Sequence, residues 1–181
     1  MSHKDWVAVG DLPGTRIKWR YEMKGRRYDF FDETGTYLGS ENNDNFLPAS
    51  ETVSETYFSK AGLRPMGLGP VIIPWPTWRR GYKWGTKANI EMPDGRRLRV
   101  WFKGYSRQRS AVLKVLDESG EPLVAVRWTG KDSFFSAPGY KRHGEAVIAP
   151  GKVLPTEPVL FAAYAVHLLI QATDVVPVAT G

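Results

Sequence analysis

Apolar and polar residues alternate along "TRIKWRYEM", residues 15–23, near the start of the chain. The apolar set is Ile17, Trp19, Tyr21 and Met23, and it alternates with Arg16, Lys18, Arg20 and Glu22. This period of two predicts a strand with one buried face.

The next stretch, "RRYDFFDETGTYLGSE", predicts a hairpin in which Asp32 caps the turn and Gly35 supplies a positive φ. Residues 16–41 therefore predict a meander of antiparallel strands.

Two later segments have the same hairpin character. The turn "PDG" lies between Ile90 and Leu98, and "DESG", residues 117–120, lies between two runs rich in Val and Leu. The residues Asp32, Glu33, Thr34, Gly35 and Leu38 correspond to Asp117, Glu118, Ser119, Gly120 and Leu123 at one constant spacing of 85 residues. An internal duplication explains this match, and so does chance, because Asp-x-x-Gly is a common hairpin turn.

The stretch from about 41 to 70 is polar, with Asn, Ser, Gly and Pro spread through it. This composition predicts a long excursion between the two strand-rich parts of the chain. One short strand is expected within it, near residues 53–58.

"PTEPVLFAAYAVHLLIQATD" predicts the helix of the chain, at about 157–173, with Thr156 as its N-cap. Its apolar residues cover every face, so the helix must be surrounded. A membrane span needs about 20 apolar residues, and the run from Val159 to Ile170 is shorter. Because nearly every other element is a strand, we expect an all-β fold with one helix. Its form would be a closed antiparallel β-barrel of about twelve strands around that helix, in one domain over residues 1–181.

The composition limits the kinds of functional site and partner that the chain can have. The chain has no cysteine, which excludes disulfides, thiolate metal sites and cysteine nucleophiles. Its formal net charge of +6 favours anionic partners. The beginning of the sequence lacks the apolar stretch of a signal peptide, so a cytoplasmic protein is expected.

The hairpins "FFDETG" and "LKVLDESG", followed by a hydrophobic C-terminal helix, resemble the tubby-like superfamily. That superfamily includes tubby C-terminal domains, LURP-one-related proteins and phospholipid scramblases. The resemblance covers nearly the whole chain and implies a twelve-stranded barrel around a central helix. It also implies binding of phosphoinositide headgroups by surface Lys and Arg. No tubby phosphoinositide motif is recognisable in this sequence, so the resemblance assigns no binding residue. The chain also lacks the cysteine-rich and proline-rich segments of scramblases.

Signs of an enzyme are scarce. We assign no catalytic residue, no metal ligand and no cofactor, because the three histidines have no metal spacing and no phosphate loop or nucleophile motif occurs. His143 lies in the basic segment "GYKRHGE", predicted as a loop. His167, inside the apolar helix, is expected to be a buried hydrogen-bonded residue. The carboxylates of "DETG" and "DESG" are expected to cap turns.

The strongest candidate for a binding site is "VIIPWPTWRRGYKWG", residues 71–85, an edge or loop leading into a strand at Tyr82. There Arg79, Arg80 and Lys83 would contact an anion, with Trp78 and Trp84 stacking on the ligand. The alternative is that these tryptophans cover the rim of the barrel. A reserve set, Arg97, Arg99 and Lys103, shares one strand face opposite Leu98, Val100 and Phe102.

The sequence therefore predicts a non-enzymatic intracellular binding module. Its expected ligand is a phosphoinositide, another acidic lipid headgroup or a phosphorylated molecule, with peripheral membrane contact and no transmembrane segment. Two alternatives stay open. The chain could be a protein-interaction subunit of a larger assembly, or it could bind single-stranded nucleic acid, for which no recognised motif is present.

Overall fold

The structure is a computed structural model that describes residues 12–22, 24–42, 45–49, 56–57, 64–66, 83–91, 95–105, 110–128 and 142–174. For residues 56–57, 64–66, 83–91, 103–105, 110 and 171–174, only the backbone is described. Trp78, Arg79 and Arg80 lie outside the described residues, as does most of the stretch from 50 to 82.

One antiparallel sheet contains all eleven strands of the described residues. The strands are β1 (Thr15–Glu22), β2 (Arg27–Phe31), β3 (Tyr37–Asn42), β4 (Asn45–Pro48), β5 (Thr56–Tyr57), β6 (Arg64–Met66), β7 (Lys83–Glu91), β8 (Arg97–Tyr105), β9 (Ser110–Leu116), β10 (Pro122–Trp128) and β11 (His143–Ile148). Their order across the sheet is β5-β4-β3-β2-β1-β11-β10-β9-β8-β7-β6. Eight of these strands have five or more residues, and β4, β5 and β6 are shorter. For the residues that the structure describes, the predicted fold class is confirmed as all-β with one helix, α2 (Pro158–Asp174).

The prediction of a closed barrel of about twelve strands was wrong for the described residues, in which the sheet is open and β5 and β6 form its edges. The strand directions supply a physical reason. Ten antiparallel pairings lead across the sheet from β5 to β6, so these two strands run in the same direction. Neighbours in an antiparallel ladder must run in opposite directions. An antiparallel ladder therefore cannot join β5 directly to β6.

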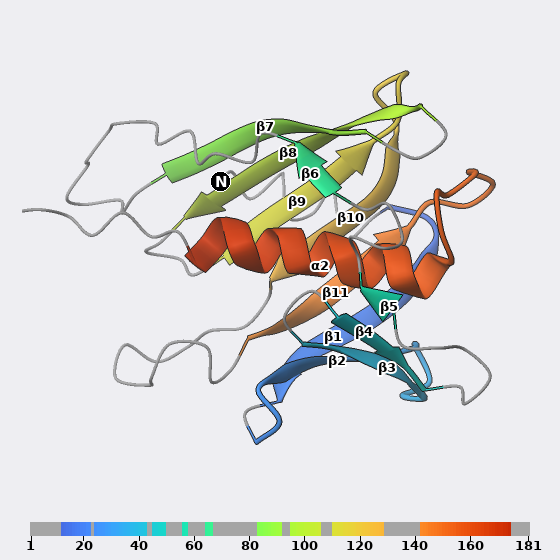
Figure 1. Cartoon of the computed structure of the whole chain (residues 1–181), viewed down its shortest axis with the longest axis vertical. Helices are drawn as coiled ribbons and strands as arrows, with labels where there is room; N and C mark the ends of the chain where they lie inside the picture. Colours follow the sequence, from blue (N-terminus) through green and yellow to red (C-terminus); the bar gives the residue numbers. More distant parts are fainter. Residues whose placement is uncertain are drawn as a thin grey trace, which may run out of the picture.

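Helix α2 is nevertheless buried on every face, as its apolar sequence predicted. The six consecutive residues from Phe161 to Val166 are at most 1% exposed. Figure 1 shows α2 lying across the concave side of the sheet, with β7–β9 on one side and β1–β4 on the other. The helix contacts β3, β8, β9, β10 and β11. A strongly curved open sheet thus provides much of the enclosure that we expected from a closed one.

The predicted helix range of about 157–173 is one residue from the observed range at each end, but the predicted N-cap was wrong. The carbonyl of Glu157 accepts the first helical hydrogen bond, from the amide of Phe161 at 2.9 Å. Glu157 is therefore the N-cap residue, and Pro158 occupies the first helical position, where its missing N–H costs nothing.

The hydrogen-bonded role predicted for His167 is confirmed, although its side chain is 15% exposed and so only partly buried. Its Nδ1 lies 2.9 Å from Oε1 of Glu41, which is only 3% exposed and points inward from β3. This contact connects α2 to β3, in the part of the sheet formed by β1–β4.

The two Asp-x-x-Gly turns are equivalent in structure. In the first, Oδ1 of Asp32 accepts hydrogen bonds from the amides of Thr34 and Thr36. In the second, Oδ1 of Asp117 accepts them from the amides of Ser119 and Glu121. Gly35 and Gly120 both have φ of +89°, as the turn requires.

The equivalence extends into the flanking strands. Each hairpin has a bulge just after the turn, at Leu38 and at Leu123, which are 85 residues apart. The bulge carbonyl accepts a hydrogen bond from the residue after the next strand, from Ala49 in the first case and Ala149 in the second. We call β2–β3–β4 the first unit and β9–β10–β11 the second unit.

Candidate functional site

The outward face of β1 carries cations because the inward positions are taken by the core. Ile17 and Trp19 are each 1% exposed on the inner face, which directs Lys18 and Arg20 to the outside. β11 pairs with β1, so that Glu145 lies opposite Lys18 and His143 lies opposite Arg20. On the far side of β11, Arg127 of β10 lies opposite Glu145. β1 and the consecutive strands β10 and β11, which come much later in the sequence, therefore place charged side chains next to one another.

These side chains line a surface groove of about 590 Å³, which we call the outer groove. Its lining consists of residues from β1, β2, β10, β11 and the first Asp-x-x-Gly turn: Lys18, Trp19, Arg20, Phe31, Gly35, Arg127, His143, Gly144 and Glu145. The groove lies within the size range of small-molecule sites.

The charges of the outer groove are positive in sum. The lining contains three cationic side chains, Lys18, Arg20 and Arg127, and one carboxylate, Glu145. Oε1 of Glu145 accepts a hydrogen bond from Nη1 of Arg16 at 3.0 Å and lies 2.6 Å from Nη2 of Arg127. These two partners hold the carboxylate in place. No ion pair forms to Lys18 among the described residues.

Gly144, which lies opposite Trp19, has no room for a side chain. A Cβ at this position would lie 1.9 Å from the carbonyl oxygen of Arg127 and 2.8 Å from Cζ2 of Trp19. Glycine is thus required for the close approach of β11 to β10.

Arg20 also contacts an aromatic ring at the edge of the groove. Its guanidinium carbon lies 4.8 Å from the ring centroid of Phe31, a cation–π contact that leaves the N–H groups at the guanidinium edge able to donate. The arrangement can therefore bind an anion by charge and by directional hydrogen bonds. Among the described side chains, no group of three His, Asp or Glu residues is placed to hold a metal ion.

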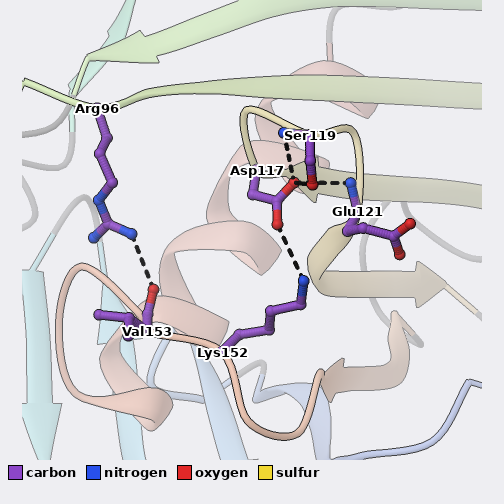
Figure 2. A network of polar contacts seen from close by, with 6 residues as sticks. All are labelled: Arg96, Asp117, Ser119, Glu121, Lys152 and Val153. Carbon is purple, nitrogen blue, oxygen red and sulfur yellow. Dashed lines mark hydrogen bonds and ion pairs between the residues drawn. The ribbon is translucent and has the colours of Figure 1, made fainter.

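A second polar cluster surrounds Asp117 and is structural in character. Figure 2 shows its carboxylate between the 117–121 turn and Lys152, whose Nζ donates to Oδ2 at 3.2 Å. The hydroxyl of Ser119, the amide of Glu121 and the ammonium of Lys152 together lower the pKa of Asp117 to about 2. Nearby, Arg96 donates to the carbonyl of Val153 at 3.0 Å. These contacts attach the connection before α2 to β8 and β9, and the predicted role of Asp117 as a turn cap is confirmed.

The predicted site residues are only partly described. The backbones of Lys83 and Trp84 open β7, and that of Lys103 lies in β8, while the side chains of these three residues are not described. Arg97 and Arg99 are exposed and alternate with the buried Leu98 and Val100, which confirms the predicted strand face. The binding roles of all eight predicted residues stay predictions.

Strand register relates one of these residues to the outer groove. A transverse row runs from Lys18 through Glu145 and Arg127 to Val112 and then Lys103. Lys103 is thus two strands beyond Arg127, whereas Arg97 and Arg99 lie toward the opposite end of β8.

Sequence reasoning missed the outer groove, although part of the signal was present. The alternation in residues 15–23 already placed Lys18 and Arg20 on one strand face. His143, which we expected in a loop, is instead the first residue of β11. Nothing in the sequence indicated that β11 pairs with β1, and this pairing is what creates the groove.

No helix among the described residues has the length and apolar character needed to cross a membrane. Comparisons of the chain with family models, with curated proteins and with solved structures gave no match.

Proposed function

We propose that the protein is a non-enzymatic intracellular binding module whose outer groove takes a phosphate-bearing anionic ligand. A phosphoinositide or another acidic lipid headgroup is the ligand class that we favour. The observation that carries this proposal is the convergence of Lys18, Arg20 and Arg127 on one groove that contains a single carboxylate.

The chemistry of these side chains suits phosphate. The guanidinium of Arg20 can donate two parallel hydrogen bonds to phosphate oxygens, and the ammonium of Lys18 adds a point charge. The carboxylate of Glu145 can accept a hydrogen bond from a ligand hydroxyl, as a phosphorylated polyol would provide. The resemblance of the hairpins and the terminal helix to the tubby-like superfamily points to the same ligand class, and membership in that superfamily is part of the proposal.

Isothermal titration calorimetry with soluble inositol 1,4,5-trisphosphate tests the groove directly. The paired substitution Lys18→Ala, Arg20→Ala should weaken binding by about a hundredfold or more, because each removed charge-assisted hydrogen bond contributes about 1.5–3 kcal/mol. Arg97→Ala, Arg99→Ala is the matched control, since it removes the same charge from exposed positions on β8. Equal weakening in both variants, or no binding by the unaltered protein, would contradict the proposal.

A second variant compares the groove with the site predicted from sequence. Arg79→Ala, Arg80→Ala, Lys83→Ala removes the three cations of residues 71–85. We expect it to retain binding of inositol trisphosphate. Loss of binding in this variant, together with retention in the Lys18 and Arg20 variant, would move the site to that segment.

A further inference from the structure

We infer that the outward face of β1–β4 docks on an anionic lipid bilayer, with Tyr37 and Leu47 entering the membrane interface beside the outer groove. This inference rests on the proposed function, because the groove would hold the headgroups. It goes further by assigning an apolar contact to residues that do not line the groove.

Register places the two apolar side chains in line with the cations. One transverse row of outward positions runs from Tyr37 through Phe31 to Lys18 and Glu145. The next row runs from Leu47 through Ser40 and Asp29 to Arg20 and His143. Both rows therefore begin with an apolar residue on β3 or β4 and end at the groove.

Tyr37 and Leu47 project into solvent, with exposed fractions of 40% and 45%. The ring of Tyr37 lies 5.7 Å from that of Phe31, over which the guanidinium of Arg20 sits. The apolar edge thus continues through aromatic contacts to a groove cation. Tyrosine with a polar hydroxyl, beside exposed cations, is typical of surfaces that lie at the headgroup level of a bilayer.

Both acidic residues of these rows are paired with arginine. Asp29 is only 4% exposed, and its Oδ1 accepts a hydrogen bond from Nε of Arg27 at 2.8 Å. Oε1 of Glu145 lies 3.0 Å from Nη1 of Arg16 and 2.6 Å from Nη2 of Arg127. Arg27 itself remains accessible, with 43% of its side chain exposed. Lys18, Arg20 and Arg27 outnumber the partly exposed Glu22, which lies opposite Arg27 on β1. This part of the face therefore has a positive net charge, which is complementary to acidic lipid.

Isolated exposed apolar residues are common on soluble proteins. The described residues contain one more large exposed apolar side chain, Val153, which is 77% exposed in the connection between β11 and α2. Val153 lies outside these rows and provides a matched control for the apolar contact.

The first experiment measures binding to vesicles of phosphatidylcholine containing phosphatidylinositol 4,5-bisphosphate. Tyr37→Ser, Leu47→Ser should weaken vesicle binding by about tenfold through loss of apolar contact. Binding of soluble inositol trisphosphate should be unchanged. Val153→Ser should leave both measurements unchanged. Vesicle binding that is insensitive to Tyr37→Ser, Leu47→Ser, or equally sensitive to Val153→Ser, would overturn the inference.

The second experiment uses the absence of cysteine from the chain. Leu47→Cys and, separately, Val153→Cys each give a single thiol for an environment-sensitive fluorophore. With anionic vesicles, the emission of the label at 47 should shift to the blue, and that of the label at 153 should not. An unshifted label at 47 on vesicle-bound protein overturns the membrane contact while the proposed headgroup site stands. Absence of both vesicle and inositol trisphosphate binding in the unaltered protein overturns the proposed function and this inference with it.

Discussion

The first unit (β2–β3–β4) and the second unit (β9–β10–β11) share a turn, a bulge and a bulge hydrogen bond, yet they fill the interior differently. Gly39 of the first unit is equivalent to Val124 of the second, and Phe46 of the first unit is equivalent to Ala146 of the second. A Cβ on Gly39 would lie 2.8 Å from Cζ of Phe46. In the first unit, the ring of Phe46 on the third strand therefore occupies the space beside Gly39. In the second unit, the side chain of Val124 on the middle strand occupies the equivalent space.

The units also differ in polarity and in what surrounds their turns. Glu41 of the first unit, which binds His167, corresponds to the buried Val126 of the second. The turn with Asp117 is held by Lys152, whereas Gly35 of the turn with Asp32 lines the outer groove. The comparison teaches that local sequence is sufficient for the shared hairpin. Neighbouring strands and the helix determine whether that hairpin serves the core or a binding surface.

The largest expected effect is that of Gly39→Val, which gives the first unit the residue of the second. We expect a loss of about 3 kcal/mol in the free energy of unfolding, because the site is tightly packed and Gly39 has φ of +145°. Urea unfolding measures it.

Adding Phe46→Ala to the Gly39→Val variant should restore part of the stability. The two substituted positions then carry the same residues as Val124 and Ala146 of the second unit. The restoration is incomplete because the carbonyl of Leu47 lies 2.6 Å from the same Cβ position. Unaltered stability in the Gly39→Val variant would contradict the packing difference between the units.

A smaller effect is expected when Glu41→Val gives the first unit the apolar residue of the second. The imidazole of His167 then loses the buried carboxylate, at a cost of about 2 kcal/mol in the free energy of unfolding. Combining it with His167→Leu should cost less than the sum of the single substitutions, because a matched polar pair is replaced by apolar groups. A double-mutant cycle measures this coupling, and additive losses would show that the contact does not join the helix to β3.

The smallest effect concerns the two turn carboxylates. Hydrogen bonds from Thr34 and then Thr36 lower the pKa of Asp32, and those from Ser119, Glu121 and Lys152 lower the pKa of Asp117 to about 2. Since both folded-state values lie below the ordinary 3.8, each carboxylate stabilises the fold above that pH. For Asp117 this contribution disappears as the pH falls toward about 2.

Lys152→Met should raise the pKa of Asp117 while leaving it below 3.8, because the turn hydrogen bonds remain. NMR titration of the carboxyl signals measures this change, with Asp32 as the internal control. An unchanged pKa of Asp117 would show that Lys152 does not distinguish the two turns.

Prediction from sequence succeeded where short-range chemistry decides the outcome. The positive φ of Gly35, the outward position of Arg97 and Arg99 and the buried helix each follow from a few neighbouring residues. The candidate site could not be found in this way, because Arg20 and His143 are paired only through the contact of β1 with β11. The sequence match between the two turns left duplication and chance open, and the shared bulges now strengthen the case for equivalence.

The sequence by itself determined an all-β chain with an Asp-capped turn in each unit and a helix that has to be enclosed. Periodicity, turn chemistry and an apolar surface without a polar face are properties of short segments. Only the tertiary structure decided that β1 pairs with β11, that β5 and β6 form the edges of the described sheet and that cations from three strands meet in one groove. Nine of the ten strand pairings join consecutive strands, but the pairing of β1 with β11 joins residues more than a hundred positions apart, which no local pattern encodes.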